Sequence, residues 1–77
     1  MKIAVIGAGA FGYALSLLLT RTHENIEVYI YDIQKEYIDS LIKDKHHSFF
    51  FSEIITPNNL KATNNQDECL KNAEIMV

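Results

Sequence analysis

The apolar positions of this chain fall into short runs with strand spacing and longer segments with helical spacing. The strand-like segments are residues 2–6, 26–31, 60–63 and 74–77. The first is apolar and β-branched, which is typical of a strand covered on both faces, as in a parallel sheet. The second alternates, with Ile26, Val28 and Ile30 on one face. We expect the chain to end within the fourth strand.

Helical spacing predicts three helices, at residues 11–21, 34–43 and 66–72. The stripe of the first helix expected to face the sheet is Ala14, Leu15, Leu18 and Leu19. The corresponding stripe of the second helix is Tyr37, Ile38, Leu41 and Ile42. Asn65, followed by Glu68 three residues later, resembles a capping box at the start of the third helix. His23 is expected in a polar surface turn.

Three glycines follow the first strand at the spacing G-x-G-x-x-G. Gly7 permits a tight turn, because positive φ costs glycine nothing. Gly9 has no Cβ, so a pyrophosphate can approach the backbone, and Gly12 lets the helix pack closely on the strand. The free N–H groups at the helix start favour an anion. This order predicts an α/β fold, a partial Rossmann doubly wound parallel sheet built as β-α-β-α-β-α-β and truncated in the fourth strand.

The second strand ends on Asp32, twenty residues after Gly12. A carboxylate at this position can accept hydrogen bonds from the adenosine ribose hydroxyls. It would repel the extra phosphate of NADP, and no arginine follows it, Lys35 being the only near cation. We therefore expect NAD rather than NADP as the cofactor. Asp32 could also cap the second helix, and both roles could hold together.

Composition narrows the function further. The net charge of −3 gives no basic surface for nucleic acid or anionic membranes. The apolar runs are shorter than the ~20 residues that a membrane span needs. We expect neither a secretory signal nor a preceding domain. The single cysteine, Cys69, cannot form an internal disulfide, which favours a cytoplasmic protein, and we expect it half-buried in a helix. No carboxylate or cysteine stands at metal-ligand spacing from His46 and His47, so we expect no metal site.

The chain resembles the N-terminal part of a known family, the bacterial NAD(P)-dependent glycerol-3-phosphate dehydrogenases. That family opens with a strand and G-x-G-x-(W/F/Y)-G-x-A-L, which stands here as GAGAFGYAL at residues 7–15. Its P-x-N-L-x-A-T segment is similar to residues 57–63, and the helix and strand that follow are similar to residues 68–77. The resemblance covers essentially the whole chain.

The resemblance implies that Ala10 and Phe11 contact the cofactor pyrophosphate, and that the residues ending the second strand flank the adenosine. The expected cofactor-binding residues are Gly7, Gly9, Ala10, Phe11, Gly12, Tyr31, Asp32 and Ile33. The family's catalytic and phosphate-binding lysines lie beyond the fourth strand and in a C-terminal helical domain. We therefore expect residues 1–77 to be the N-terminal part of a dinucleotide-binding domain, without catalytic residues and without the substrate domain.

The implied activity of the full enzyme is reduction of dihydroxyacetone phosphate, a small-molecule substrate, to sn-glycerol 3-phosphate for phospholipid synthesis, with a homodimer as the candidate assembly. An alternative is another Rossmann reductase, similar to ketopantoate reductase or hydroxyacyl-CoA dehydrogenase. Phe11 and residues 57–63 count against it. A third interpretation is a non-catalytic, truncated nucleotide-binding module.

Overall fold

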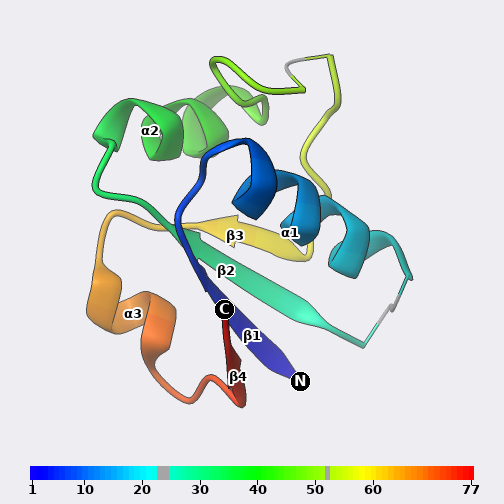
Figure 1. Ribbon diagram of the computed structural model, residues 1–77, viewed down its shortest axis with the longest axis vertical. Coiled ribbons are helices and arrows are strands. Elements are labelled where there is room, and N and C mark those ends of the chain that lie inside the picture. Colours follow the sequence, from blue (N-terminus) through cyan, green and yellow to red (C-terminus); the bar gives the residue numbers. More distant parts are fainter. Residues whose placement is uncertain (23–24, 52) are drawn as a thin grey trace.

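Strands and helices alternate along the chain as the sequence predicts. The computed structural model describes residues 1–22, 25–51 and 53–77. Its strands are β1 (Lys2–Ile6), β2 (Glu27–Tyr31), β3 (Leu60–Ala62) and β4 (Ile75–Met76). Its helices are α1 (Ala10–Thr22), α2 (Lys35–Asp44) and α3 (Gln66–Leu70). The strands are parallel and lie in the order β3-β2-β1-β4 (Figure 1), so the predicted α/β architecture, part of a Rossmann sheet, is confirmed.

One face of the sheet is covered by α1 and α2. In the pairing of β1 with β2, Ile3 lies opposite Val28 and Val5 lies opposite Ile30. Because side chains alternate along a strand, these four share one face. The helix residues packed into the same buried cluster are Tyr13, Leu17, Ile38 and Leu41. The predicted face of β2, with Val28 and Ile30 inside, is therefore confirmed.

The opposite face carries α3. Lys2 precedes Ile3 and points to this other side, where its Nζ donates hydrogen bonds to the carbonyl oxygens of Glu68 and Lys71, at 2.9 and 2.6 Å. The same ammonium lies 4.0 Å from the ring centroid of Tyr29. A positive charge at the C-terminal end of a helix is favourable. Connections between parallel strands are almost always right-handed. The chain has to pass from β3 on one side of the sheet to β4 on the other, so α3 lies on the face opposite to α1 and α2.

The buried stripe of α1 differs from the prediction. The buried residues of this helix are Tyr13, Ser16, Leu17 and Thr20. Leu18, which was expected to face the sheet, is 58% exposed. The other three predicted positions are half-buried: Ala14, Leu15 and Leu19. The buried face follows positions 13, 16, 17 and 20, and the prediction missed it because two of these four positions carry hydroxyl side chains. Ser16 Oγ donates to the carbonyl of Gly12 at 2.8 Å and Thr20 Oγ1 to that of Ser16 at 2.9 Å, so both hydroxyls are satisfied inside the core.

The second helix begins and ends one residue later than predicted. Ile38 and Leu41 are buried and Tyr37 is half-buried, as expected. Ile42 is 49% exposed, so its place in the inward stripe was wrong. Adjacent helical positions lie about 100° apart around the axis, and Ile42 is turned past the edge of the stripe. Lys45 ends the helix in the left-handed conformation, with φ of 61°, and turns the chain away.

The start of α3 has half of the expected capping box. The side chain of Asn65 accepts a hydrogen bond from the N–H of Glu68 at 3.1 Å, which confirms the cap. The reciprocal bond is replaced, because the N–H of Asn65 donates to Thr63 Oγ1 at 3.1 Å. The helix ends two residues earlier than predicted. Cys69 is fully buried rather than half-buried, with Sγ 3.3 Å from the carbonyl oxygen of Tyr29.

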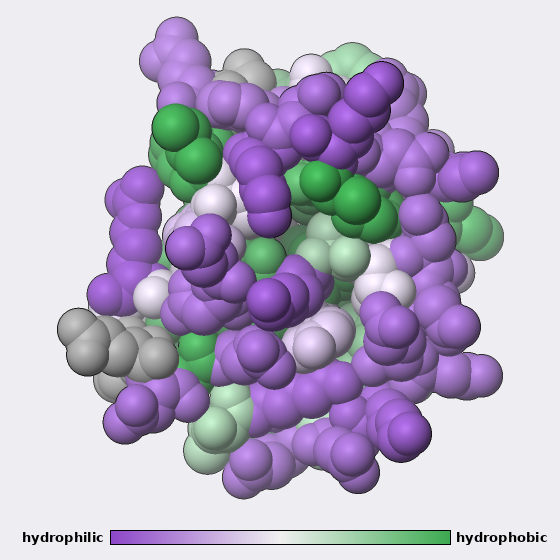
Figure 2. All heavy atoms as spheres, turned by 180° about the vertical axis from the view of Figure 1, so that it is seen from behind, coloured by the Kyte–Doolittle hydropathy of each residue, from purple (hydrophilic) through white to green (hydrophobic). Residues whose placement is uncertain are grey.

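Polar side chains dominate the side of the molecule that faces away in Figure 1. Figure 2 shows this side, on which hydrophobic groups reach the surface in a few separate places. The edge strand β4 exposes Ile75 and Met76. None of the described helices has the length and apolar character needed to cross a membrane. His23 lies outside the described residues.

Candidate cofactor site

Each glycine of the turn between β1 and α1 has a different structural setting. Gly7 has a φ of +118°, a conformation that other residues rarely adopt, as the sequence predicts for a tight turn. A Cβ on Gly12 would lie 2.0 Å from the carbonyl oxygen of Gly7, which confirms the close approach of α1 to the end of β1. A Cβ on Gly9 would meet nothing within 4 Å. The protein's own packing therefore leaves the space beside Gly9 open, as a ligand close to the backbone requires.

The carboxylate of Asp32 links this turn to the end of β2. Its Oδ2 accepts a hydrogen bond from the N–H of Ala8 at 2.6 Å, and its Oδ1 accepts one from the N–H of Gln34 at 2.7 Å. Gly7 N–H donates to the carbonyl of Tyr31 at 2.7 Å, so the two chain segments are joined twice. One interpretation of the sequence made Asp32 the N-cap of α2, and the structure shows that it is not. Gln34 occupies that position, and Asp32 holds the turn that precedes it.

The structure brings the eight sequence-predicted residues together at the C-terminal ends of β1 and β2. Parallel pairing places Ile6 opposite Tyr31, so the segments that follow β1 and β2 leave the sheet side by side. Phe11, in the first turn of α1, is 78% exposed, and Ile33 is 88% exposed. The first four N–H groups of a helix lack partners inside it, and the N–H of Ala8, just before α1, is hydrogen-bonded to Asp32. The arrangement has donors for a pyrophosphate and an acceptor for a ribose.

A further residue in this region, His47, was missed by the sequence analysis. Its imidazole is 1% exposed, and its Nε2 lies 2.6 Å from the carbonyl oxygen of Ala8. Its Nδ1 accepts hydrogen bonds from the N–H groups of Phe49 and Phe50, at 3.0 and 3.1 Å. No signal in the sequence pairs His47 with Ala8, because the two are 39 residues apart and His47 lies in an irregular segment.

The loop that follows α2 is closed on itself and lies against α1 (Figure 1). The N–H of Thr56 donates to the carbonyl of Lys45 at 2.8 Å, and the hydroxyl of Thr56 shares a hydrogen bond of 3.1 Å with that of Tyr13. Of the phenylalanines at positions 49–51 of this loop, Phe50 is half-buried. Phe49 is largely exposed, although its ring lies 5.6 Å from that of Tyr37.

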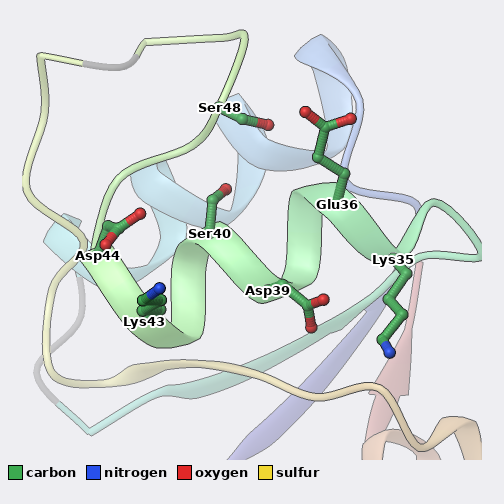
Figure 3. A pocket seen from close by; sticks show the side chains of 7 residues that line it. All are labelled: Lys35, Glu36, Asp39, Ser40, Lys43, Asp44 and Ser48. Atoms are coloured by element: carbon green, nitrogen blue, oxygen red, sulfur yellow. The ribbon is translucent and has the colours of Figure 1, made fainter.

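A separate hollow of about 480 Å³ lies along the exposed side of α2 (Figure 3). Its lining residues are Lys35, Glu36, Asp39, Ser40, Lys43, Asp44 and Ser48. Side chains of both charges line it from one end of the helix to the other. None of the eight predicted cofactor residues takes part, so this hollow is distinct from the glycine turn.

Comparison with known proteins identifies the family. Residues 2–77 match the family model described as the NAD-dependent glycerol-3-phosphate dehydrogenase N-terminus. The NAD(P)+ glycerol-3-phosphate dehydrogenase of Fusobacterium nucleatum is 31% identical over 77 residues, which are 100% of this chain and 22% of the relative. That of Orientia tsutsugamushi is 35% identical over 78 residues, covering 100% of this chain and 23% of the relative.

A solved structure has the same fold. The crystal structure of glycerol-3-phosphate dehydrogenase from Coxiella burnetii superposes with a TM-score of 0.88 at 24% identity, over 97% of this chain and 22% of that one. The chain thus spans about a fifth of the length of the relatives it matches. Because the family model covers residues 2–77, the chain belongs to the NAD-dependent glycerol-3-phosphate dehydrogenase family and corresponds to its N-terminal part.

Proposed function

We propose that residues 1–77 are the N-terminal part of a dinucleotide-binding domain and hold the pyrophosphate and adenosine of a nicotinamide cofactor. The observation that carries the proposal is the open space beside Gly9 at the start of α1, with the carboxylate of Asp32 bonded to the adjacent Ala8 N–H. The N–H groups of Gly9, Ala10 and Phe11 would bind the pyrophosphate oxygens. The exposed side chains of Phe11 and Ile33 would cover the cofactor from its two sides.

The proposed cofactor is NAD rather than NADP. Each oxygen of Asp32 accepts one backbone N–H and retains a second lone pair for a ribose hydroxyl. A phosphate on the same ribose would meet this carboxylate, and like charges at contact distance repel. Tyr31, at the end of β2, would lie near the adenine. The nearest cation along the chain after Asp32 is Lys35.

The reaction proposed for the full-length protein is reduction of dihydroxyacetone phosphate to sn-glycerol 3-phosphate, in the cytoplasm, as a supply for phospholipid synthesis. The reduced nicotinamide would supply the hydride for the substrate carbonyl. Residues 1–77 would bind and orient the other half of the cofactor. They would contribute no acid or base to the reaction, and we propose that the catalytic groups and the contacts of a homodimer lie elsewhere in the protein.

The test uses the full-length product of the gene. NADH oxidation is followed at fixed enzyme with dihydroxyacetone phosphate, and then with ketopantoate and with acetoacetyl-CoA as competing substrates of the other Rossmann reductases. We expect turnover with dihydroxyacetone phosphate alone, and more with NADH than with NADPH. Turnover with one of the other two substrates would reassign the enzyme. Cofactor binding without any turnover would favour the non-catalytic module, and no binding of either cofactor would sink the proposal.

A further inference from the structure

His47 is a buried polar side chain to which the proposed function assigns no role. Its ring lies between those of Tyr13 on α1 and Tyr37 on α2, with centroid distances of 4.9 and 4.6 Å. Buried side-chain nitrogen atoms are normally hydrogen-bonded, because an unpaired one loses its hydration without compensation. The partners of the two ring nitrogens therefore indicate what this histidine holds in place.

Those partners fix the protonation of the ring. Nδ1 faces two backbone donors, the N–H groups of Phe49 and Phe50, and must be an acceptor without a proton. The proton of the neutral imidazole is therefore on Nε2, which donates to the carbonyl oxygen of Ala8 at 2.6 Å. The ring thus connects the loop after α2 to the glycine turn in one defined orientation.

Ala8 is consequently held on both sides. Its N–H donates to Asp32 Oδ2 at 2.6 Å, while its carbonyl accepts from His47. The next residue, Gly9, has a carbonyl that accepts the first hydrogen bond of α1, from Tyr13 N–H at 2.9 Å. Two side chains from distant parts of the sequence therefore set the direction in which the chain enters α1.

We propose that His47 is a positioning residue for the nicotinamide cofactor. By holding the carbonyl of Ala8 it keeps the N–H groups at the start of α1 in the orientation that receives the pyrophosphate. This inference rests on the proposed function. If the turn samples several conformations, only the fraction of molecules in the binding-competent one can bind the cofactor, and the apparent affinity falls in proportion to that fraction. A rigid turn therefore binds the cofactor more tightly.

Two substitutions separate the hydrogen bonds of His47 from its packing. His47→Phe keeps an aromatic ring between the two tyrosines and removes both nitrogens. His47→Gln places an amide N–H close to the position of Nε2 and restores the donor to Ala8. Ser48→Ala, at an exposed neighbouring position, is the control. All are made in the full-length gene product and titrated with NADH well below the unfolding temperature.

We expect His47→Phe to weaken NADH binding about tenfold, since it removes the donor to a carbonyl in the turn. His47→Gln should retain most of the affinity, and Ser48→Ala all of it. Exchange of the Ala8 amide hydrogen, which reports opening of the turn, should accelerate in His47→Phe. The nitrogen chemical shifts of His47 should show the Nε2–H tautomer.

The outcomes distinguish failure of the role of His47 from failure of the proposed function. If the unmodified protein binds NADH and His47→Phe binds it equally well, His47 has no positioning role. A histidine with its proton on Nδ1 would overturn the proposal as well. If the unmodified protein binds neither NADH nor NADPH, the proposed function fails. In that case unchanged Ala8 exchange in His47→Phe would also refute the effect of His47 on the turn, whereas accelerated exchange would support that effect alone.

Discussion

Gly12→Ala tests the closest approach in the glycine turn. The added Cβ would lie 2.0 Å from the carbonyl oxygen of Gly7 and 3.1 Å from its carbonyl carbon. Contacts under 3.0 Å are essentially never made by real Cβ atoms, so α1 and the end of β1 must separate by at least about 1 Å. Neither group is a side chain that could rotate away. The strain therefore falls on the packing of the helix against the sheet.

The expected loss of stability follows from two opposing effects. Overpacking a core costs typically about 1–3 kcal/mol, and a contact between backbone groups belongs at the upper end. Alanine favours a helix over glycine by about 1 kcal/mol, which offsets part of that cost. We expect a net destabilisation of about 2 kcal/mol. This corresponds to roughly thirtyfold faster exchange of the amide hydrogens that become accessible to solvent only when the sheet unfolds.

Native-state hydrogen exchange in the full-length gene product measures this effect at the strand amides, such as that of Val28. Gly9→Ala is the matched variant, because its Cβ meets nothing within 4 Å. We expect Gly9→Ala to leave strand exchange unchanged but to weaken NADH binding, since the methyl group occupies the space proposed for the pyrophosphate. Unaltered strand exchange in Gly12→Ala would refute the close approach, and full NADH affinity in Gly9→Ala would refute the placement of the cofactor.

Two further predictions concern α3. Burial raises the pKa of the Cys69 thiol, so the folded state holds the thiol proton more tightly than the unfolded chain does. The resulting stabilisation is present below the pKa of the unfolded chain and is lost as the pH rises above it. The free energy of unfolding from urea titrations should therefore fall above about pH 9, and it should fall less in Cys69→Ala. Asn65→Ala removes the bond to the N–H of Glu68 and should cost about 1 kcal/mol, seen as faster exchange of that amide. Asn64→Ala, which loses an exposed side-chain contact, should leave the Glu68 amide unchanged.

Local patterns were sufficient for the order of elements and for the position of the glycine turn. Gly7 stands where the turn needs a positive φ, and Gly12 stands where the helix approaches the strand too closely for a Cβ. Both requirements exclude other residues, so the glycines mark the turn in the sequence. Asp32 could be placed beside the turn because parallel neighbouring strands end at the same edge. The family followed from the residues around that turn, together with the segment before β3.

The remaining features depend on contacts between segments distant in sequence. The hydroxyls of Ser16 and Thr20 are buried because the helix itself satisfies them, which a hydrophobic pattern does not reveal. His47 reaches Ala8 because the loop after α2 closes through Thr56 and lies against α1. Local sequence encodes where the backbone can turn, but the partner of a buried polar group is chosen by packing in three dimensions. For this chain, the glycines could be read from the sequence, and the histidine that holds their turn could not.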